Sequence, residues 1–143
     1  MPLLVAVRSG ALDSMTHEII WEKGGVHKRF WGNLSGRELA ESVEAVASHP
    51  DFDQLRFILN DFLGVESYVM DAASLERILV SRVGSRYTNP RIRVMLVTTD
   101  PVLFALADVT KPGAFPATNE TKGFATTAEA RAWFHRQPPL DQL

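Results

Sequence analysis

Apolar and polar positions alternate along the first well-patterned part of this chain. Residues 17–23 and 26–32 are two strand-like runs, and Gly24-Gly25 lies between them. Glycine tolerates the positive φ angles of two-residue turns, so the pattern predicts a β-hairpin with these two glycines at its turn. In that register Glu22 lies opposite His27.

The same alternation divides the hairpin into two faces. The face expected to meet the core carries Ile19, Trp21, Val26 and Phe30. The opposite face is mostly polar, and its candidate interface residues are Ile20, Arg29 and Trp31. Tryptophan is typical of interfaces, because it buries a large area and keeps a hydrogen-bond donor. Two alternatives stay open: the N-terminal arm folds over this face, or the edge strand pairs with its copy in a homodimer.

Helical spacing follows the hairpin. Ser35 and Glu38 form a capping-box pattern, which predicts a helix that runs to about Ser48. A second helix is expected to begin at Asp71 and to end before Asn89-Pro90, because proline disfavours helical geometry in the residue before it. Its inward stripe is predicted as Leu75, Ile78, Leu79 and Val83, and its outward charges as Glu76, Arg77, Arg82 and Arg86.

Apolar blocks between the helices predict buried strands. Residues 56–62 and 94–97 are too uniformly apolar for half-exposed strands and fit central ones. Asp100-Pro101 opens a third helix, a weak strand covers 121–125, and Thr126 caps a last helix. This order predicts an α/β fold with about four helices. Its mixed, mainly parallel five-stranded sheet has an antiparallel N-terminal hairpin strand.

Length and composition narrow the function classes. The 143 residues are expected to form one domain, 1–143, with an arm or extra strand at 1–15 and a frayed tail at 137–143. Fifteen basic residues stand against seventeen acidic ones, so no strong field favours nucleic acid. The chain has no cysteine and no apolar run long enough for a membrane span. By elimination, the cytoplasm is the expected compartment, and no cofactor is expected.

Four segments together resemble the SpoIIAA-like, or STAS, superfamily, which comprises antagonists of anti-sigma factors and an uncharacterised bacterial branch. They are 30–35, 60–65, 71–75 and 129–134. The resemblance implies a (βα) superhelix, a plan shared with CRAL-TRIO lipid-binding domains. In the antagonists, a partner kinase phosphorylates a serine that follows an aspartate at the start of the second main helix. Here Asp71 is followed by Ala72, which removes that switch and leaves Ser74 as the remaining candidate.

Polar residues follow the predicted parallel strands at their carboxyl ends, where ligands gather in open α/β sheets. They are Asn33, Asn60, Asp61, Asp71, Thr98 and Asp100. They predict a small polar pocket. The alternative is that Asp71 and Asp100 cap helices and Asn60 holds a turn. None of the four histidines has metal-ligand spacing, so no metal site is expected.

Three functions remain open, and the sequence favours the first. It is a non-catalytic regulatory module that binds a protein partner or itself, as a homodimer. The second is a carrier or sensor of a small apolar or amphipathic ligand, as in CRAL-TRIO relatives, with Phe115 in the loop 111–116 as a lid. The third is an enzyme, for which no catalytic trio is present.

Overall fold

The computed structural model describes residues 16–105 and 120–140. The elements are β1 (His17–Glu22), β2 (Gly25–Ser35), α2 (Gly36–Ala47), the 3-10 turn η2 (Phe52–Gln54), β3 (Phe57–Val69), α3 (Ala72–Thr88), β4 (Arg93–Val97), α4 (Pro101–Phe104), β5 (Glu120–Phe124) and α6 (Thr127–Arg136). The predicted arm and the lid residue Phe115 lie outside the described residues. None of the described helices is long and apolar enough to cross a membrane.

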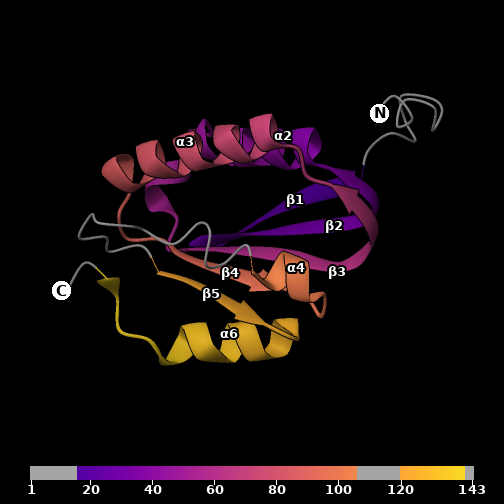
Figure 1. Cartoon of the computed structure of the whole chain (residues 1–143). Coiled ribbons are helices and arrows are strands. Elements are labelled where there is room, and N and C mark those ends of the chain that lie inside the picture. Colours follow the sequence, from indigo (N-terminus) through magenta and orange to yellow (C-terminus); the bar gives the residue numbers. More distant parts are fainter. Residues whose placement is uncertain (1–15, 106–119, 141–143) are drawn as a thin grey trace.

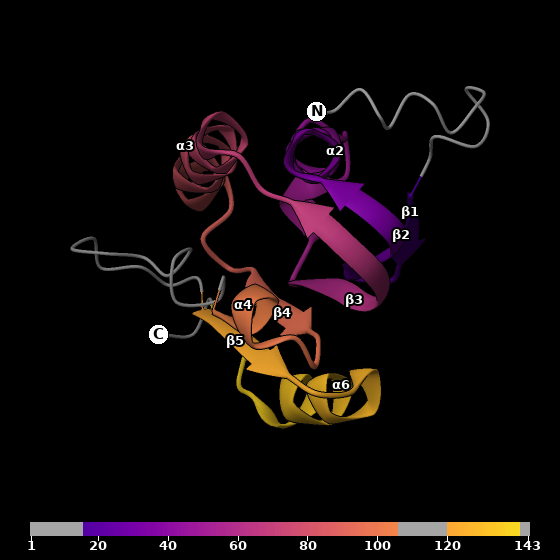
Figure 2. The same ribbon diagram turned by 45° about the vertical axis from the view of Figure 1, so that its right-hand side comes forward.

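The five strands form one sheet in the order β1-β2-β3-β4-β5 (Figure 1). β1 is antiparallel to β2, and the other neighbours are parallel. Helices α2 and α3 lie side by side on one face of the sheet, and α6 covers part of the other face (Figure 2). The predicted fold class, a mixed and mainly parallel sheet entered through a hairpin, is confirmed.

Two apolar layers cover the two faces of the sheet. On the face below α2 and α3, the core includes Val26, Phe30, Phe62, Val94, Leu39 and Ile78. On the α6 face it consists of Phe57, Leu59, Met95, Val97, Ala130 and Trp133. Alternate residues of β3 belong to different layers, because successive side chains of a strand point to opposite faces. This is the reason for the uniformly apolar start of that strand.

The hairpin turn lies one residue earlier than predicted, which shifts the strand pairing by two positions. Lys23 and Gly24 form the turn, Gly24 has a φ of 73°, and Glu22 pairs with Gly25 instead of His27. A shift of two residues changes every partner but leaves each side chain on its predicted face. The predicted division into a core face and an outer face therefore holds, although the predicted register is wrong.

Gly25 belongs to the strand because it gives room to an aromatic ring. It pairs with Phe57, and a Cβ at position 25 would lie 2.1 Å from that ring. The ring of Phe57 in turn packs on Phe134, with 4.9 Å between centroids. The contact joins residues more than thirty positions apart, so local turn chemistry does not reveal it.

We expect Gly25→Ala to lower the free energy of unfolding by about 1–3 kcal/mol, because it overpacks this buried contact. The matched control is Gly84→Ala in α3, where an added Cβ meets nothing within 4 Å. That change should stabilise the protein by about 0.5–1 kcal/mol through helix propensity. Urea denaturation of both variants measures the two effects, and equal midpoints for Gly25→Ala and the unmodified chain would contradict the register.

β3 has 13 residues and does not end at Phe62, where the predicted strand 56–62 ends. The strand continues to Val69, because the second half of β2 pairs with it as far as Ser35. Gly64 permits β2 to lie close to β3, because a Cβ at position 64 would lie 3.0 Å from the carbonyl oxygen of Phe30. Asn60 and Asp61 are consequently in mid-strand and not at its carboxyl end.

The helix caps are as predicted. The side chains of Ser35, Asp71, Asp100 and Thr126 accept hydrogen bonds from the first-turn amides of α2, α3, α4 and α6. The second half of the capping box is absent. The Glu38 carboxylate instead accepts from the Thr16 amide at 2.8 Å and lies 2.6 Å from Nδ1 of His17, which ties α2 to β1.

The buried face of α3 also differs from the prediction. Leu79 and Val83 were expected inward, but they are 37% and 39% exposed. Arg82 was expected outward, but it is half-buried and lines the space between α3 and the sheet. Apolar residues occur all round this helix, so periodicity does not single out one face, and packing on the sheet decides it.

Candidate functional site

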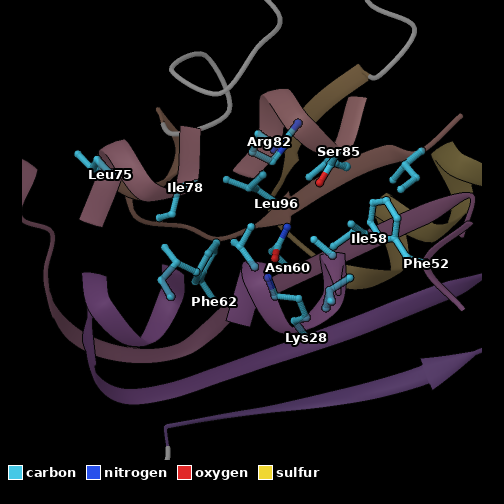
Figure 3. A pocket seen from close by; sticks show the side chains of 16 residues that line it. Lys28, Phe52, Ile58, Asn60, Phe62, Leu75, Ile78, Arg82, Ser85 and Leu96 are labelled. Carbon is cyan, nitrogen blue, oxygen red and sulfur yellow. The ribbon is translucent and has the colours of Figure 1, made fainter. Parts of the chain in front are cut away.

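A cavity of about 80 Å³ lies between the sheet and the helix pair α2 and α3 (Figure 3). Twelve of its sixteen lining residues are apolar, among them Leu39, Val46, Ile58, Phe62, Leu75 and Ile78. The four polar ones are Lys28, Asn60, Arg82 and Ser85. Lys28 and Asn60 enter from the sheet, whereas Arg82 and Ser85 enter from α3.

Lys28 is a core residue in the middle of β2. It shares the inward face with Val26 and Phe30, since side chains two positions apart point the same way. Its side chain is 2% exposed, and its Nζ lies 5.6 Å from the centroid of the Phe30 ring. Among residues 16–105 and 120–140, no hydrogen bond or ion pair holds this amine. Burial, with a contribution from Arg82, lowers the pKa of Lys28 to about 7.

Arg82 and Asn60 complete the polar part of the cavity. Asn60 is directly opposite Lys28 in the register of β2 and β3, and it is 9% exposed. Arg82 donates from Nη2 to Oγ1 of Thr121 at 3.1 Å. Burial, and then the charge of Arg86, lowers the pKa of Arg82 to about 10.

No carboxylate contributes to the pKa of either cation. A buried charge is normally paired, because its transfer from water costs several kcal/mol. Two cationic side chains and one amide therefore meet an apolar space without a counter-charge from the described residues. The cavity is suited to a small ligand that carries both a negative group and a hydrocarbon part.

Of the six residues predicted to form a polar pocket, only Asn60 lines this cavity. Asp61 points to the opposite face of the sheet, where its Oδ2 lies 3.2 Å from Nε2 of His27. Asn33 accepts a hydrogen bond from the Ser67 hydroxyl at the far end of β2. The structure separates these residues because β3 continues past Asp61 and alternation sends neighbours to opposite faces.

The other three residues lie at helix starts. Asp71 caps α3 and is 3.0 Å from the place where a Cβ of Gly36 would be. Asp100 caps α4 and accepts from the Tyr68 hydroxyl at 3.1 Å, and Thr98 accepts from the amide of Asp100. A ligand role for any of the six stays a prediction. No group of three or more metal-ligating side chains occurs within the described ranges.

The candidate interface residues lie on the outer hairpin face. Ile20 and Trp31 are each 38% exposed, and Arg29 donates to the Glu18 carboxylate at 3.1 Å. Ile20 pairs with His27, so the Arg29–Glu18 pair lies between the two apolar residues. Their role in a homodimer or an interface stays a prediction.

Comparison with known proteins identifies the fold. Neither a family model nor a curated protein matches this chain, but solved structures do. SpoIIAA, an anti-sigma factor antagonist solved in its unphosphorylated form, has a TM-score of 0.55 and 13% identity; the match covers 85% of this chain and 99% of that one. The protein has a SpoIIAA-like fold.

Two further structures share this SpoIIAA-like fold. An uncharacterised protein of the DUF3478 family from Shewanella loihica PV-4 has a TM-score of 0.53 and 12% identity, over 82% of this chain and 91% of that chain. An anti-sigma factor antagonist from Mycobacterium paratuberculosis has a TM-score of 0.52 and 14% identity, over 84% and 93%. The resemblance to the SpoIIAA-like fold inferred from the sequence is confirmed.

The start of α3 is the segment that resembles the phosphorylation site of the SpoIIAA-like antagonists. Ala72 is exposed and has no hydroxyl. Ser74 is 4% exposed, and a Cβ on Gly36 would lie 2.9 Å from its Cβ. The Ser74 side chain is thus enclosed at the contact between α3 and the start of α2, where a phosphate would displace that contact.

The sequence interpretation missed Lys28 and Arg82. The signal for Lys28 was present, because the predicted core face of the hairpin contains Val26 and Phe30 and therefore position 28 as well. Arg82 follows the buried Ile78 by one helical turn, which places it on the same side of α3. Because of their charge, Arg82 was predicted to point outward and Lys28 was assigned to neither face of the hairpin.

Proposed function

We propose that this chain is a non-catalytic protein-interaction module, and that the exposed apolar side of α3 contacts a different protein. The observation that carries the proposal is one strip of large apolar side chains. The strip consists of Leu79, Val80, Val83 and Tyr87. Val80 and Tyr87 are 68% and 74% exposed.

The geometry of the strip supports a docking role. At about 100° per residue, its four positions fall within an arc of about 100° on one side of the helix. Contiguous exposed apolar residues of this kind mark interaction sites, whereas single ones are ordinary. The side of α3 that carries Ile78 packs on the cavity and the core, so the helix is held in place by its other face.

The comparisons favour a different protein as the occupant over a second copy. Two of the similar structures are named as anti-sigma factor antagonists, and antagonism of a protein requires contact with a protein. In the antagonists that the sequence resembles, phosphorylation at the start of the equivalent helix blocks docking. A surface on α3 is consistent with that location, and the loss of the acceptor at Ala72 implies docking without that switch.

We expect the double variant Val80→Asp, Tyr87→Ser to weaken partner binding at least about tenfold, because both changes remove apolar contact area. The partner is first identified by cross-linking in the source cells and is then purified for titration calorimetry. The matched control is Ile20→Ser, Trp31→Ser on the outer hairpin face. It should bind within about twofold of the unmodified chain, since rim or remote residues contribute little.

Two results would overturn the α3 proposal. Loss of binding in the hairpin control, with binding kept in the α3 variant, would assign the interface to the hairpin face. A dimer in sedimentation equilibrium that only the hairpin variant dissociates, with no heterologous partner bound, would favour self-association. Because α3 and the outer hairpin face lie on opposite sides of the sheet, the two variants do not disturb each other's surface.

A second candidate function is carriage or sensing of a small ligand. The specific observation in its favour is the cavity that contains Lys28, an almost fully buried residue to which no carboxylate of the described residues is paired. This function and protein docking are compatible, since the cavity and the exposed strip lie on opposite sides of α3. An enzyme is not proposed, because no nucleophile, base and orienting group converge in the cavity.

A further inference from the structure

We propose that the cavity binds a short-chain monocarboxylate, with its charged end near Lys28, Asn60 and Arg82 and its hydrocarbon end among the apolar walls. The proposal rests on the second candidate function and names the chemical class of its ligand. It is independent of docking through α3.

The sign of the ligand's charge follows from the side chains that enter the cavity. Lys28 is almost fully buried and points into it, and Arg82 lines it from α3 above, with its guanidinium directed to Thr121 (Figure 3). No acidic side chain is among the sixteen lining residues. A cationic ligand would add a third positive charge, and a neutral one would leave Lys28 unpaired, whereas an anion supplies the missing partner.

The shape of the polar group favours a carboxylate. Lys28, Asn60 and Arg82 are among the four polar lining residues, and twelve apolar residues form the rest. A carboxylate has two oxygens and one charge, which an amine, an amide and a guanidinium on two facing elements can hold. A phosphate monoester brings nearly two charges and three oxygens and would force part of them against hydrocarbon.

The size of the cavity limits the length of the ligand. Its volume of about 80 Å³ is roughly half that of the cavity of about 150 Å³ that admits benzene in an engineered protein. A six-membered ring with a carboxyl group therefore does not fit without expansion of the core. Acetate and propionate, which have fewer non-hydrogen atoms than benzene, are the matching acids, whereas butyrate has as many as benzene.

The direct test is a titration of the purified chain with propionate, n-propanol and n-propylamine in a buffer free of carboxylates. Isothermal calorimetry and the shift of the thermal midpoint measure binding. We expect propionate to bind and to raise the midpoint, n-propanol to bind at least about tenfold more weakly, and n-propylamine not to bind, because only the anion pairs with the cationic side chains.

Variants locate the site. Lys28→Met should weaken propionate binding at least about tenfold, whereas Lys23→Met, at the exposed hairpin turn, should leave it unchanged. Propionate affinity should also fall between pH 6.5 and 9, as Lys28 loses its proton. Asn60 lies beside Lys28 on the adjacent strand, Arg82 approaches from α3, and Arg86 adds a further positive charge beside Arg82. None of these gains a charge in that range.

Each outcome has a distinct meaning. Tighter binding of n-propanol than of propionate would overturn the carboxylate class but keep the ligand-binding function. No binding by any of the three compounds would overturn both. Propionate binding that survives Lys28→Met would place the site elsewhere and overturn the proposal.

Discussion

Replacing Lys28 with methionine should raise the free energy of unfolding of this protein at pH 7 by about 1–4 kcal/mol. A protein with a buried charge is often less stable than one with a hydrophobic side chain of similar volume at the same position. The Lys28 amine is 2% exposed and lacks a counter-charge within the described residues. Methionine keeps an unbranched stem of similar shape that fits an irregular apolar space.

The pH dependence of stability tests the cause. Lys28 has a pKa of about 7 in the folded protein, against an ordinary value of 10.5. Its destabilising effect is therefore complete below pH 7 and is relieved as pH rises, because the unfolded chain then holds the proton that the folded chain has released. The unmodified protein should gain up to about 1.4 kcal/mol per pH unit between pH 7 and 9 relative to Lys28→Met.

Urea denaturation at pH 6, 7, 8 and 9 measures both effects, with Lys23→Met as the exposed control. The advantage of Lys28→Met should be largest at pH 6 and smallest at pH 9. Equal pH slopes in the two proteins would show that Lys28 does not change its protonation on folding. Such a cost in stability is expected where a residue is kept for binding and not for packing, which agrees with the ligand proposed above.

Replacing Asn89 with alanine should lower the free energy of unfolding by about 2–4 kcal/mol, because it removes three hydrogen bonds of a fully buried side chain. Asn89 is fully buried just after α3. Its Nδ2 donates to the carbonyl oxygens of Phe52 and Leu55 at 2.8 and 3.0 Å, and its Oδ1 accepts from the Arg91 amide at 3.1 Å. One side chain thus joins the end of α3 to the loop before β3.

The matched control for this experiment is Asn33→Ala. Asn33 is exposed, and its Oδ1 accepts a hydrogen bond from the Ser67 hydroxyl, so water replaces the lost bond. We expect a change of at most about 0.5 kcal/mol there. A loss in Asn89→Ala no larger than the loss in Asn33→Ala would show that the loop before β3 does not depend on these bonds.

Asn89 also illustrates what a local pattern omits. The sequence interpretation used Asn89-Pro90 only as the end of a helix, and the helix does end there. The partners of its side chain lie 34 and 37 positions away. No periodicity or turn rule connects such distant positions, so the stabilising role of the residue is visible only after folding.

In the candidate site, too, part of the arrangement was predictable from local pattern and part arises only on folding. The core face of the hairpin was predicted from alternation, and that face includes position 28. The cavity itself arises only where α3 crosses the sheet and places Arg82 above Asn60. The exposed strip on α3 was likewise not predicted, because the helix has apolar residues on both sides.

The sequence by itself determined the caps at Ser35, Asp71, Asp100 and Thr126, the order of strands and helices, and the faces of the hairpin. Each of these depends on residues within a few positions of one another. The tertiary structure decided the hairpin register, the length of β3, the buried side of α3 and the isolation of the Lys28 amine. These depend on contacts such as Gly25 with Phe57 and β2 with β3, which form only when distant segments meet.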